Sequence, residues 1–240
     1  MKLFVWILGL LFSYNFVSAQ SNSNLLSASP GHQALCSLSN QSSISKHFAY
    51  IYVHNDSILD QQLATVDSEI VQLDIRFAHS FMQRFLAADS AFTKHQPLPV
   101  FWNTYFADTN RNAITYWMLG MNAHINGDLP VVFATHFTLK ELKQHYKQFK
   151  SYNPSFDKQI IWGMQQAIVA QKKIRILHRL SLGLDRLFVQ RTIHRWRKRA
   201  YKAAISMHEK GIVNYALLER RCRKTDKKIR AFSKRFIQSQ

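Results

Sequence analysis

The chain of 240 residues carries 32 Lys and Arg against 14 Asp and Glu, a formal net charge of +18 at pH 7. Its two cysteines are too few for a disulfide framework, and no apolar run beyond the N-terminus is long enough to cross a bilayer. The charge is uneven, because residues 171–240 hold 21 Lys and Arg against 4 Asp and Glu. The positive charge therefore belongs to the last third of the chain.

The first stretch, "MKLFVWILGLLFSYNFVSA", has the layout of a secretory signal peptide. An early Lys2 precedes an apolar core over residues 3–12, and the stretch ends in small residues at 17–19. The alternative is a membrane anchor, but the apolar run is short for the roughly 20 residues that a spanning helix needs. We predict a signal peptide over residues 1–19, cleaved before Gln20, and a periplasmic or extracellular protein.

Residues 20–45 are rich in Ser and Asn without a sustained period, which predicts a flexible entry segment. Residues 46–240 are predicted to form a single helical domain. The period of "HFAYIYVHND" does not decide between strand and helix. Residues 68–88 show clear helical spacing, with apolar residues on one broad face: Ile70, Leu73, Phe77, Phe81 and Phe85.

The stretch "TNRNAITYWMLGMNAHINGDL" is predicted to be a central helix. Leu129 precedes Pro130, which predicts a kink or stop there. Thr138 with Glu141 forms a capping box that opens the next helix. An Asn-Pro pair at 153–154 then starts a long helix that we expect to run towards residue 180.

The last third, residues 171–240, fits two basic amphipathic helices separated by Gly211. No alternating pattern is long enough to build a sheet. The predicted fold is all-α: a helical bundle with a buried central helix and a basic amphipathic C-terminal region.

Polar residues interrupt the apolar surface of the central helix. His124 and Asp128 are four residues apart, so they share one face with apolar neighbours. Asn122 and Asn126 form a second four-spaced pair on the nearly opposite face. Glycines at 120 and 127 lie on a third strip of the helix. Because each glycine inside a helix costs roughly 1 kcal/mol against alanine, the pair indicates that a neighbouring backbone approaches closely there. The helix is therefore expected to be buried on nearly every side.

Buried polar groups need partners, since an unpaired buried amide or hydroxyl costs roughly 1–3 kcal/mol. Asp74 falls in the middle of the apolar face of the 68–88 helix. We therefore expect Asp74, His124 and Asp128 to meet between two packed helices.

The segments "LDIRFAHSFMQRFLAAD", "FWNTYF" and "YWMLGMNAHINGDLP" resemble domain-of-unknown-function family 5995, which is marked by an N-A-H-I-N-x-D-L signature. The resemblance covers roughly residues 45–180. It brings no established activity, but it implies that Asn122, His124, Asn126 and Asp128 belong to the family's shared core.

Three interpretations of this polar centre remain open. In the first, a divalent metal that activates water for hydrolysis is held by His124 and Asp128, with Asp74 or His79 as the third ligand. Without a metal, Asp128 would orient His124 as a general base. A hydrogen-bond network that fixes helix register is the structural alternative. No nucleophile, phosphate-binding or zinc motif is present.

The basic C-terminal helices also allow three interpretations: a solvated charged face, a surface for anionic lipid headgroups, and nucleic-acid binding, the weakest for an exported chain. Two functional hypotheses follow. One is a hydrolase, whose polar centre must open to a substrate pocket. The other is a non-catalytic envelope protein with a closed centre, which docks on a membrane or an acidic partner.

Overall fold

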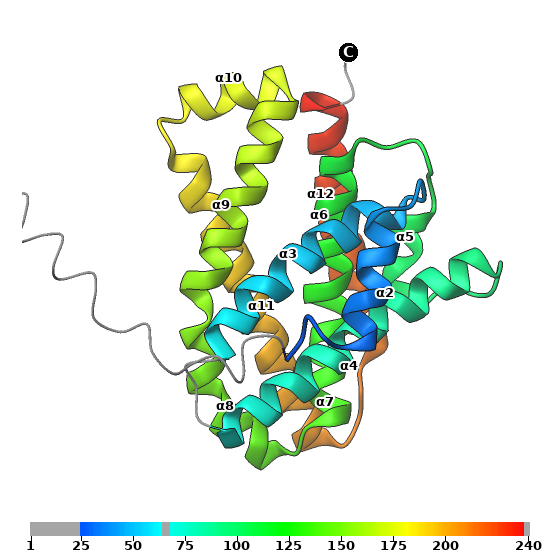
Figure 1. Cartoon of the computed structure of the whole chain (residues 1–240), viewed down its shortest axis with the longest axis vertical. Coiled ribbons are helices and arrows are strands. Elements are labelled where there is room, and N and C mark those ends of the chain that lie inside the picture. Colours follow the sequence, from blue (N-terminus) through cyan, green and yellow to red (C-terminus); the bar gives the residue numbers. More distant parts are fainter. Residues whose placement is uncertain (1–24, 64–67, 238–240) are drawn as a thin grey trace, which may run out of the picture.

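The computed structural model describes residues 25–63 and 68–237, and these ranges contain helices and no strand (Figure 1). The predicted all-α class is confirmed. In chain order the elements are α2 (Pro30–Ser39), α3 (Ser45–Leu63), α4 (Ser68–Thr93), the 3₁₀ turn η1 (Val100–Trp102), α5 (Asn103–Phe106), α6 (Ala113–Asn122), the π-helical segment η2 (Ala123–Asp128), α7 (Leu129–His136), α8 (Leu139–Ser151), α9 (Asn153–Ala170), α10 (Lys172–Leu180), α11 (Leu184–Lys210) and α12 (Tyr215–Phe236). The predicted signal peptide, residues 1–19, lies outside the described residues.

Several helix ends follow from local side-chain chemistry. The capping box at Thr138 and Glu141 is confirmed, with both reciprocal hydrogen bonds present. The side chain of Asn112 accepts the Ile114 N–H and caps α6. Gly211 ends α11 with a φ of 63°, a left-handed conformation that glycine adopts without a steric penalty.

Two predicted boundaries are wrong. Within the segment that we expected to be flexible, Pro30–Ser39 form α2, because Ser29 caps the helix and Leu35 packs into the core. The long helix after residue 153 breaks at Gln171, whose backbone is extended. Arg175 donates to the carbonyls of Ile168 and Val169, so side-chain hydrogen bonds replace helical ones at the end of α9.

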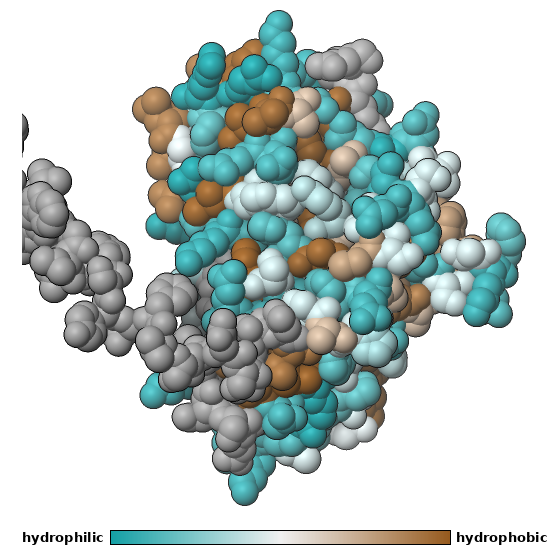
Figure 2. All heavy atoms as spheres, viewed as in Figure 1, coloured by the Kyte–Doolittle hydropathy of each residue, from teal (hydrophilic) through white to brown (hydrophobic). Residues whose placement is uncertain are grey.

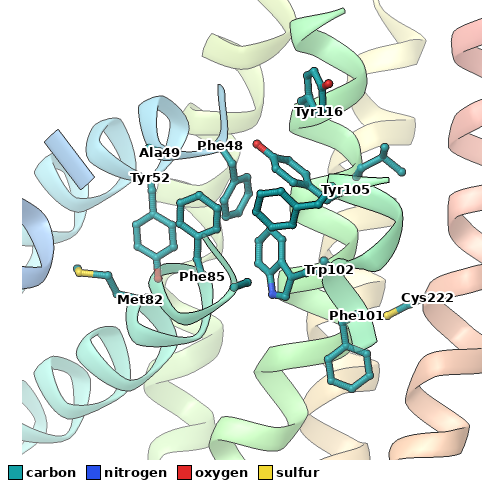
Figure 3. Packing of buried hydrophobic residues seen from close by; sticks show 14 of the residues in the cluster. Phe48, Ala49, Tyr52, Met82, Phe85, Phe101, Trp102, Tyr105, Tyr116 and Cys222 are labelled. Carbon is teal, nitrogen blue, oxygen red and sulfur yellow. The ribbon is translucent and has the colours of Figure 1, made fainter. Parts of the chain in front are cut away.

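The helical run α6–η2–α7 lies at the centre of the bundle. It packs against α3, α4 and η1 on one side and against α11 and α12 on the other. Figure 3 shows the aromatic part of the core, where rings from α3, α4 and η1 pack together, among them Phe48, Phe85 and Trp102. The predicted buried central helix is confirmed.

The glycines of the central helix make room for aromatic rings and not for a neighbouring backbone. A Cβ at Gly120 would lie 2.8 Å from Phe48 Cγ, and one at Gly127 would lie 2.7 Å from Phe101 Cβ. The expected close approach is therefore correct in position, but the approaching group is a side chain.

Cys36 and Cys222 are both free, so no disulfide joins them in this structure. None of the described helices is long and apolar enough to cross a bilayer.

Candidate functional site

Three of the signature residues, His124, Asn126 and Asp128, lie on the π-helical segment η2, and Asn122 is the last residue of α6 before it. Pro130 has no N–H and would crowd the carbonyl four residues before it in a regular α-helix. The chain instead widens before the proline, and the Leu129 N–H donates to the carbonyl of His124. The helical run thus continues through Pro130, where we expected a kink or stop, and the wider turn sets the directions of His124 and Asp128.

His124 and Asp128 form a hydrogen-bonded pair, as their spacing predicts. His124 Nδ1 lies 3.1 Å from Asp128 Oδ2, and His124 Nε2 lies 3.2 Å from the Tyr52 hydroxyl. A carboxylate only accepts, so Nδ1 carries the proton and Nε2 accepts from Tyr52. Burial lowers the pKa of His124 below its ordinary value, against the opposing effect of Asp128. The imidazole is therefore held neutral with both nitrogens engaged.

Asp128 accepts from two further donors brought from other elements. Arg84 Nε in α4 lies 3.1 Å from Oδ1, and Trp102 Nε1 at the end of η1 lies 2.8 Å from Oδ2. The side chain of Asp128 is fully buried, whereas that of Arg84 is 33% exposed. Arg84 thus compensates the buried carboxylate from the edge of the core.

Aromatic rings enclose the pair. The His124 ring stacks on Phe81 with centroids 3.3 Å apart and a 16° interplanar angle, and Phe48 and Tyr52 of α3 meet it in T-shaped contacts. Only 4% of His124 is exposed. A hollow in the described part of the chain is lined by other residues, among them Arg76, His136, Glu141 and His208. The His124–Asp128 pair itself is enclosed by side chains.

Asn122 and Asn126 belong to a second cluster, on the side facing α12. Asn122 Nδ2 donates to Asp226 Oδ1 at 2.7 Å and to the Cys222 carbonyl at 3.0 Å, while its Oδ1 accepts from Asn126 Nδ2 at 2.8 Å. Burial raises the pKa of Asp226 above its ordinary value. This cluster joins the central helix to α12, the helix of the basic region.

Asp74 takes a different partner from the one expected. It accepts a hydrogen bond from the Tyr152 hydroxyl at the junction of α8 and α9, and it is buried. Within residues 25–63 and 68–237, no group of three His, Cys, Asp or Glu side chains is arranged to hold a metal ion. The geometry therefore lends no support to a centre of Asp74, His124 and Asp128, or to His79 as its third ligand.

Sequence reasoning missed four members of these clusters: Tyr52, Arg84, Trp102 and Asp226. Only Asp226 leaves a signal, since it continues the buried stripe of Cys222 and Ile229 on α12, where an apolar residue would be expected. Tyr52, Arg84 and Trp102 lie on segments whose hydrophobic pattern identifies them only as ordinary core or surface residues.

A different feature appears at the end of the bundle where α9, α10 and α11 meet. Of the eleven exposed large hydrophobic residues in the described chain, eight lie between residues 169 and 188: Val169, Ile176, Leu177, Leu180, Leu182, Leu184, Leu187 and Phe188. We call residues 169–188 the α10–α11 surface. It also carries five Lys and Arg against one acidic residue, Asp185.

Figure 2 shows hydrophobic atoms among hydrophilic ones at the end of the molecule where Figure 1 places α10. Single exposed leucines are ordinary, but large exposed hydrophobic residues gathered in one part of the surface, with cations among them, are typical of an interaction surface. α10 has no buried residue, and its apolar anchor on the bundle is the partly buried Ile174. This surface is thus the second candidate for function.

One comparison with known proteins gives a match. A family model described as "Family of unknown function (DUF5995)" matches residues 33–239. The matched range includes the basic helices α11 and α12, which lie beyond the resemblance over residues 45–180. No curated protein and no solved structure matches the chain.

Proposed function

Because the chain belongs to DUF5995, a family of unknown function, we propose its function from its surface chemistry: it is a non-catalytic protein whose basic C-terminal helices dock on an anionic membrane surface. The observation that carries this proposal is the gathering of eight exposed large hydrophobic residues and five Lys or Arg within residues 169–188. Apolar side chains with a cationic border match the acyl chains and headgroups of an anionic lipid interface.

The closed polar centre supports the non-catalytic half of the proposal. A general base needs a free nitrogen within reach of a substrate proton. Both nitrogens of His124 are engaged by Asp128 and Tyr52, and aromatic rings cover the imidazole. The cluster fixes α3, α4, η1 and η2 relative to one another, which is the work of a structural polar network.

The other interpretations of the basic region explain less. A solvated charged face accounts for the cations but leaves the exposed apolar residues, such as Phe188 at 72% exposure, without a role. A nucleic acid would attract the cations, but its phosphate backbone offers no apolar counterpart to those side chains. An anionic membrane accounts for both, and the predicted export of the chain would bring it to an envelope membrane.

Co-sedimentation with vesicles tests the proposal. We expect the chain without the predicted signal peptide, residues 20–240, to bind vesicles that contain phosphatidylglycerol and phosphatidylcholine, and to bind phosphatidylcholine alone weakly. Raising the salt from about 0.1 M to about 1 M should weaken binding, because the Debye length falls from about 10 Å to about 3 Å. Equal binding to both kinds of vesicle at both salt concentrations contradicts the electrostatic proposal.

A matched pair of charge variants locates the surface. Lys172→Glu with Arg179→Glu reverses two exposed cations on α10, and Lys140→Glu with Lys143→Glu reverses two exposed cations on α8. At about 1 kcal/mol for each cation at an anionic surface, the α10 variant should bind at least about 30-fold more weakly. The α8 variant has the same net charge and should bind nearly as well as the wild type. Equal losses in both variants would show that net charge alone attracts the protein.

A further inference from the structure

The turn between α10 and α11 presents leucines to solvent. Leu182 is 90% exposed, and its neighbours Leu180 and Leu184, which end α10 and begin α11, are 77% and 65% exposed. All three lie at the turn, and most of each side chain is exposed to solvent instead of packing on the protein.

The backbone of the turn is unfavourable for a leucine. Leu182 has a φ of 49°, in the left-handed region that glycine, asparagine and aspartate occupy far more readily. Leu182 also buries almost nothing in return, so packing does not compensate the strain. Strained residues of this kind gather where function needs the conformation.

Side-chain hydrogen bonds hold the turn in this shape. His178 Nδ1 near the end of α10 lies 2.8 Å from Asp185 Oδ2 in the first turn of α11. Ser181 Oγ donates to Asp185 Oδ1 at 2.8 Å. These bonds tie α10 to α11 across Leu182. They also engage the one acidic side chain of the α10–α11 surface, so the remaining charges there are positive.

The helix before the turn has the composition of an interfacial helix. α10 crosses the end of the bundle at a large angle to α9 (Figure 1). Its outward apolar residues, Ile176, Leu177 and Leu180, are exposed, and Lys172 and Arg179 beside them are exposed as well. Amphipathic helices with cations around an apolar face lie in the plane of the membrane, with that face buried about 5–10 Å into the boundary of the acyl chains.

We infer that the α10–α11 turn is a membrane-insertion element: Leu180, Leu182 and Leu184 enter the acyl-chain region of an anionic bilayer while α10 lies along the headgroups. The inference rests on the proposed docking function and adds to it an inserted element and an orientation. The bundle stands on the membrane with the α10 end down, and the junction of α7 and α8, at the other end of the molecule in Figure 1, faces away.

Substitutions of apolar side chains in the same chain of residues 20–240 give the first test. Leu180→Ser and Leu182→Ser should each lower the partition coefficient onto anionic vesicles about ten-fold or more, since burying one leucine side chain supplies that much free energy. Ile212→Ser is the matched control, because Ile212 is 69% exposed but lies between α11 and α12. It should bind as the wild type does. Equal binding by all three variants overturns the inference.

Leu182→Gly separates insertion from folding. Glycine relieves the positive φ, so this variant should melt at the same temperature as the wild type or higher. It should nevertheless bind vesicles about ten-fold more weakly, because the leucine side chain is gone. Weaker binding with greater stability cannot come from unfolding. Unchanged binding by this variant contradicts insertion of Leu182.

A depth measurement completes the test and separates the two proposals. Leu180→Trp places an indole at the tip, and Lys140→Trp places one at the start of α8 as the matched control. Lipids brominated on their acyl chains should quench the added fluorescence of the first variant and not that of the second. If wild-type protein binds anionic vesicles in a salt-sensitive manner but Leu180→Trp stays unquenched, docking stands and insertion is wrong. If the wild type does not bind, both proposals fail.

Discussion

Removal of the Asp128 carboxylate is the sharpest test of the view that the polar centre is structural. Asp128 accepts hydrogen bonds from Arg84, Trp102 and His124 in a fully buried position. In Asp128→Ala the indole N–H and the imidazole N–H lose their acceptor inside the core, at about 1–3 kcal/mol each. Arg84 is 33% exposed and can turn to water at a smaller cost. We expect a total loss of about 3–5 kcal/mol in the free energy of unfolding.

Asp128→Asn is the matched control, because it keeps the shape of the side chain. Its amide oxygen can still accept from Trp102 and His124, while its NH₂ group faces the donor of Arg84. One charge-assisted bond is then lost, and we expect a cost of about 1.5–3 kcal/mol.

Urea unfolding followed by circular dichroism gives both values at neutral pH, and at this chain length about 1 kcal/mol corresponds to about 2–4 °C in melting temperature. A loss below about 1 kcal/mol in Asp128→Ala would refute the reasoning. That result would indicate that the buried His124–Asp128 pair has a role other than stability, and it would favour the hydrolase hypothesis.

Three further predictions concern other parts of the fold. Gly127→Ala should destabilise the protein by about 1–3 kcal/mol in the same urea assay, because the new Cβ would lie 2.7 Å from Phe101 Cβ; a stabilised variant would mean that the ring moves freely. A thiol reagent should modify Cys36 in the native protein and reach Cys222 only in denaturant. The reason is that Cys222 is buried and that burial raises the pKa of its thiol well above the ordinary value. Two fast-reacting thiols in the native protein would contradict this packing. The pKa of Glu141 is lowered to about 2, first by the Thr138 N–H and then by Arg76, so its contribution is complete above its unfolded pKa of about 4.5 and disappears as the pH falls towards 2. The stability gap between wild type and Glu141→Gln should therefore close between pH 5 and pH 2 in thermal melts; a gap of constant size would show that the carboxylate's charge is not involved.

Much of the local structure was readable from single segments of the chain. The capping box at Thr138, the end of α11 at Gly211 and the pairing of His124 with Asp128 each depend on residues a few positions apart. Such features follow from short-range sterics and hydrogen bonds, which the local sequence contains in full. The π-helical turn before Pro130 is the exception, because a proline inside a helix permits a stop, a kink or a widened turn.

The composition of the polar centre was not readable in the same way. Tyr52 reaches His124 from 72 residues away, and Asp226 reaches Asn122 from 104 residues away. Asp74 was expected beside His124 because both interrupt an apolar face, but it is bound by Tyr152 instead. A helical period identifies the face that is buried, yet it does not say which helix covers that face.

The sequence by itself determined an all-α chain with a buried central helix, its polar pairs and a basic last third, since periodicity, four-residue spacing and charge are properties of neighbouring residues. Only the tertiary structure decided which distant side chains complete those pairs, and that the leucines between residues 177 and 187 face solvent instead of a core. The physical reason is the same in both cases. An apolar stripe looks identical in sequence whether or not another helix packs on it, and only the arrangement of the described helices leaves the α10–α11 surface exposed among them.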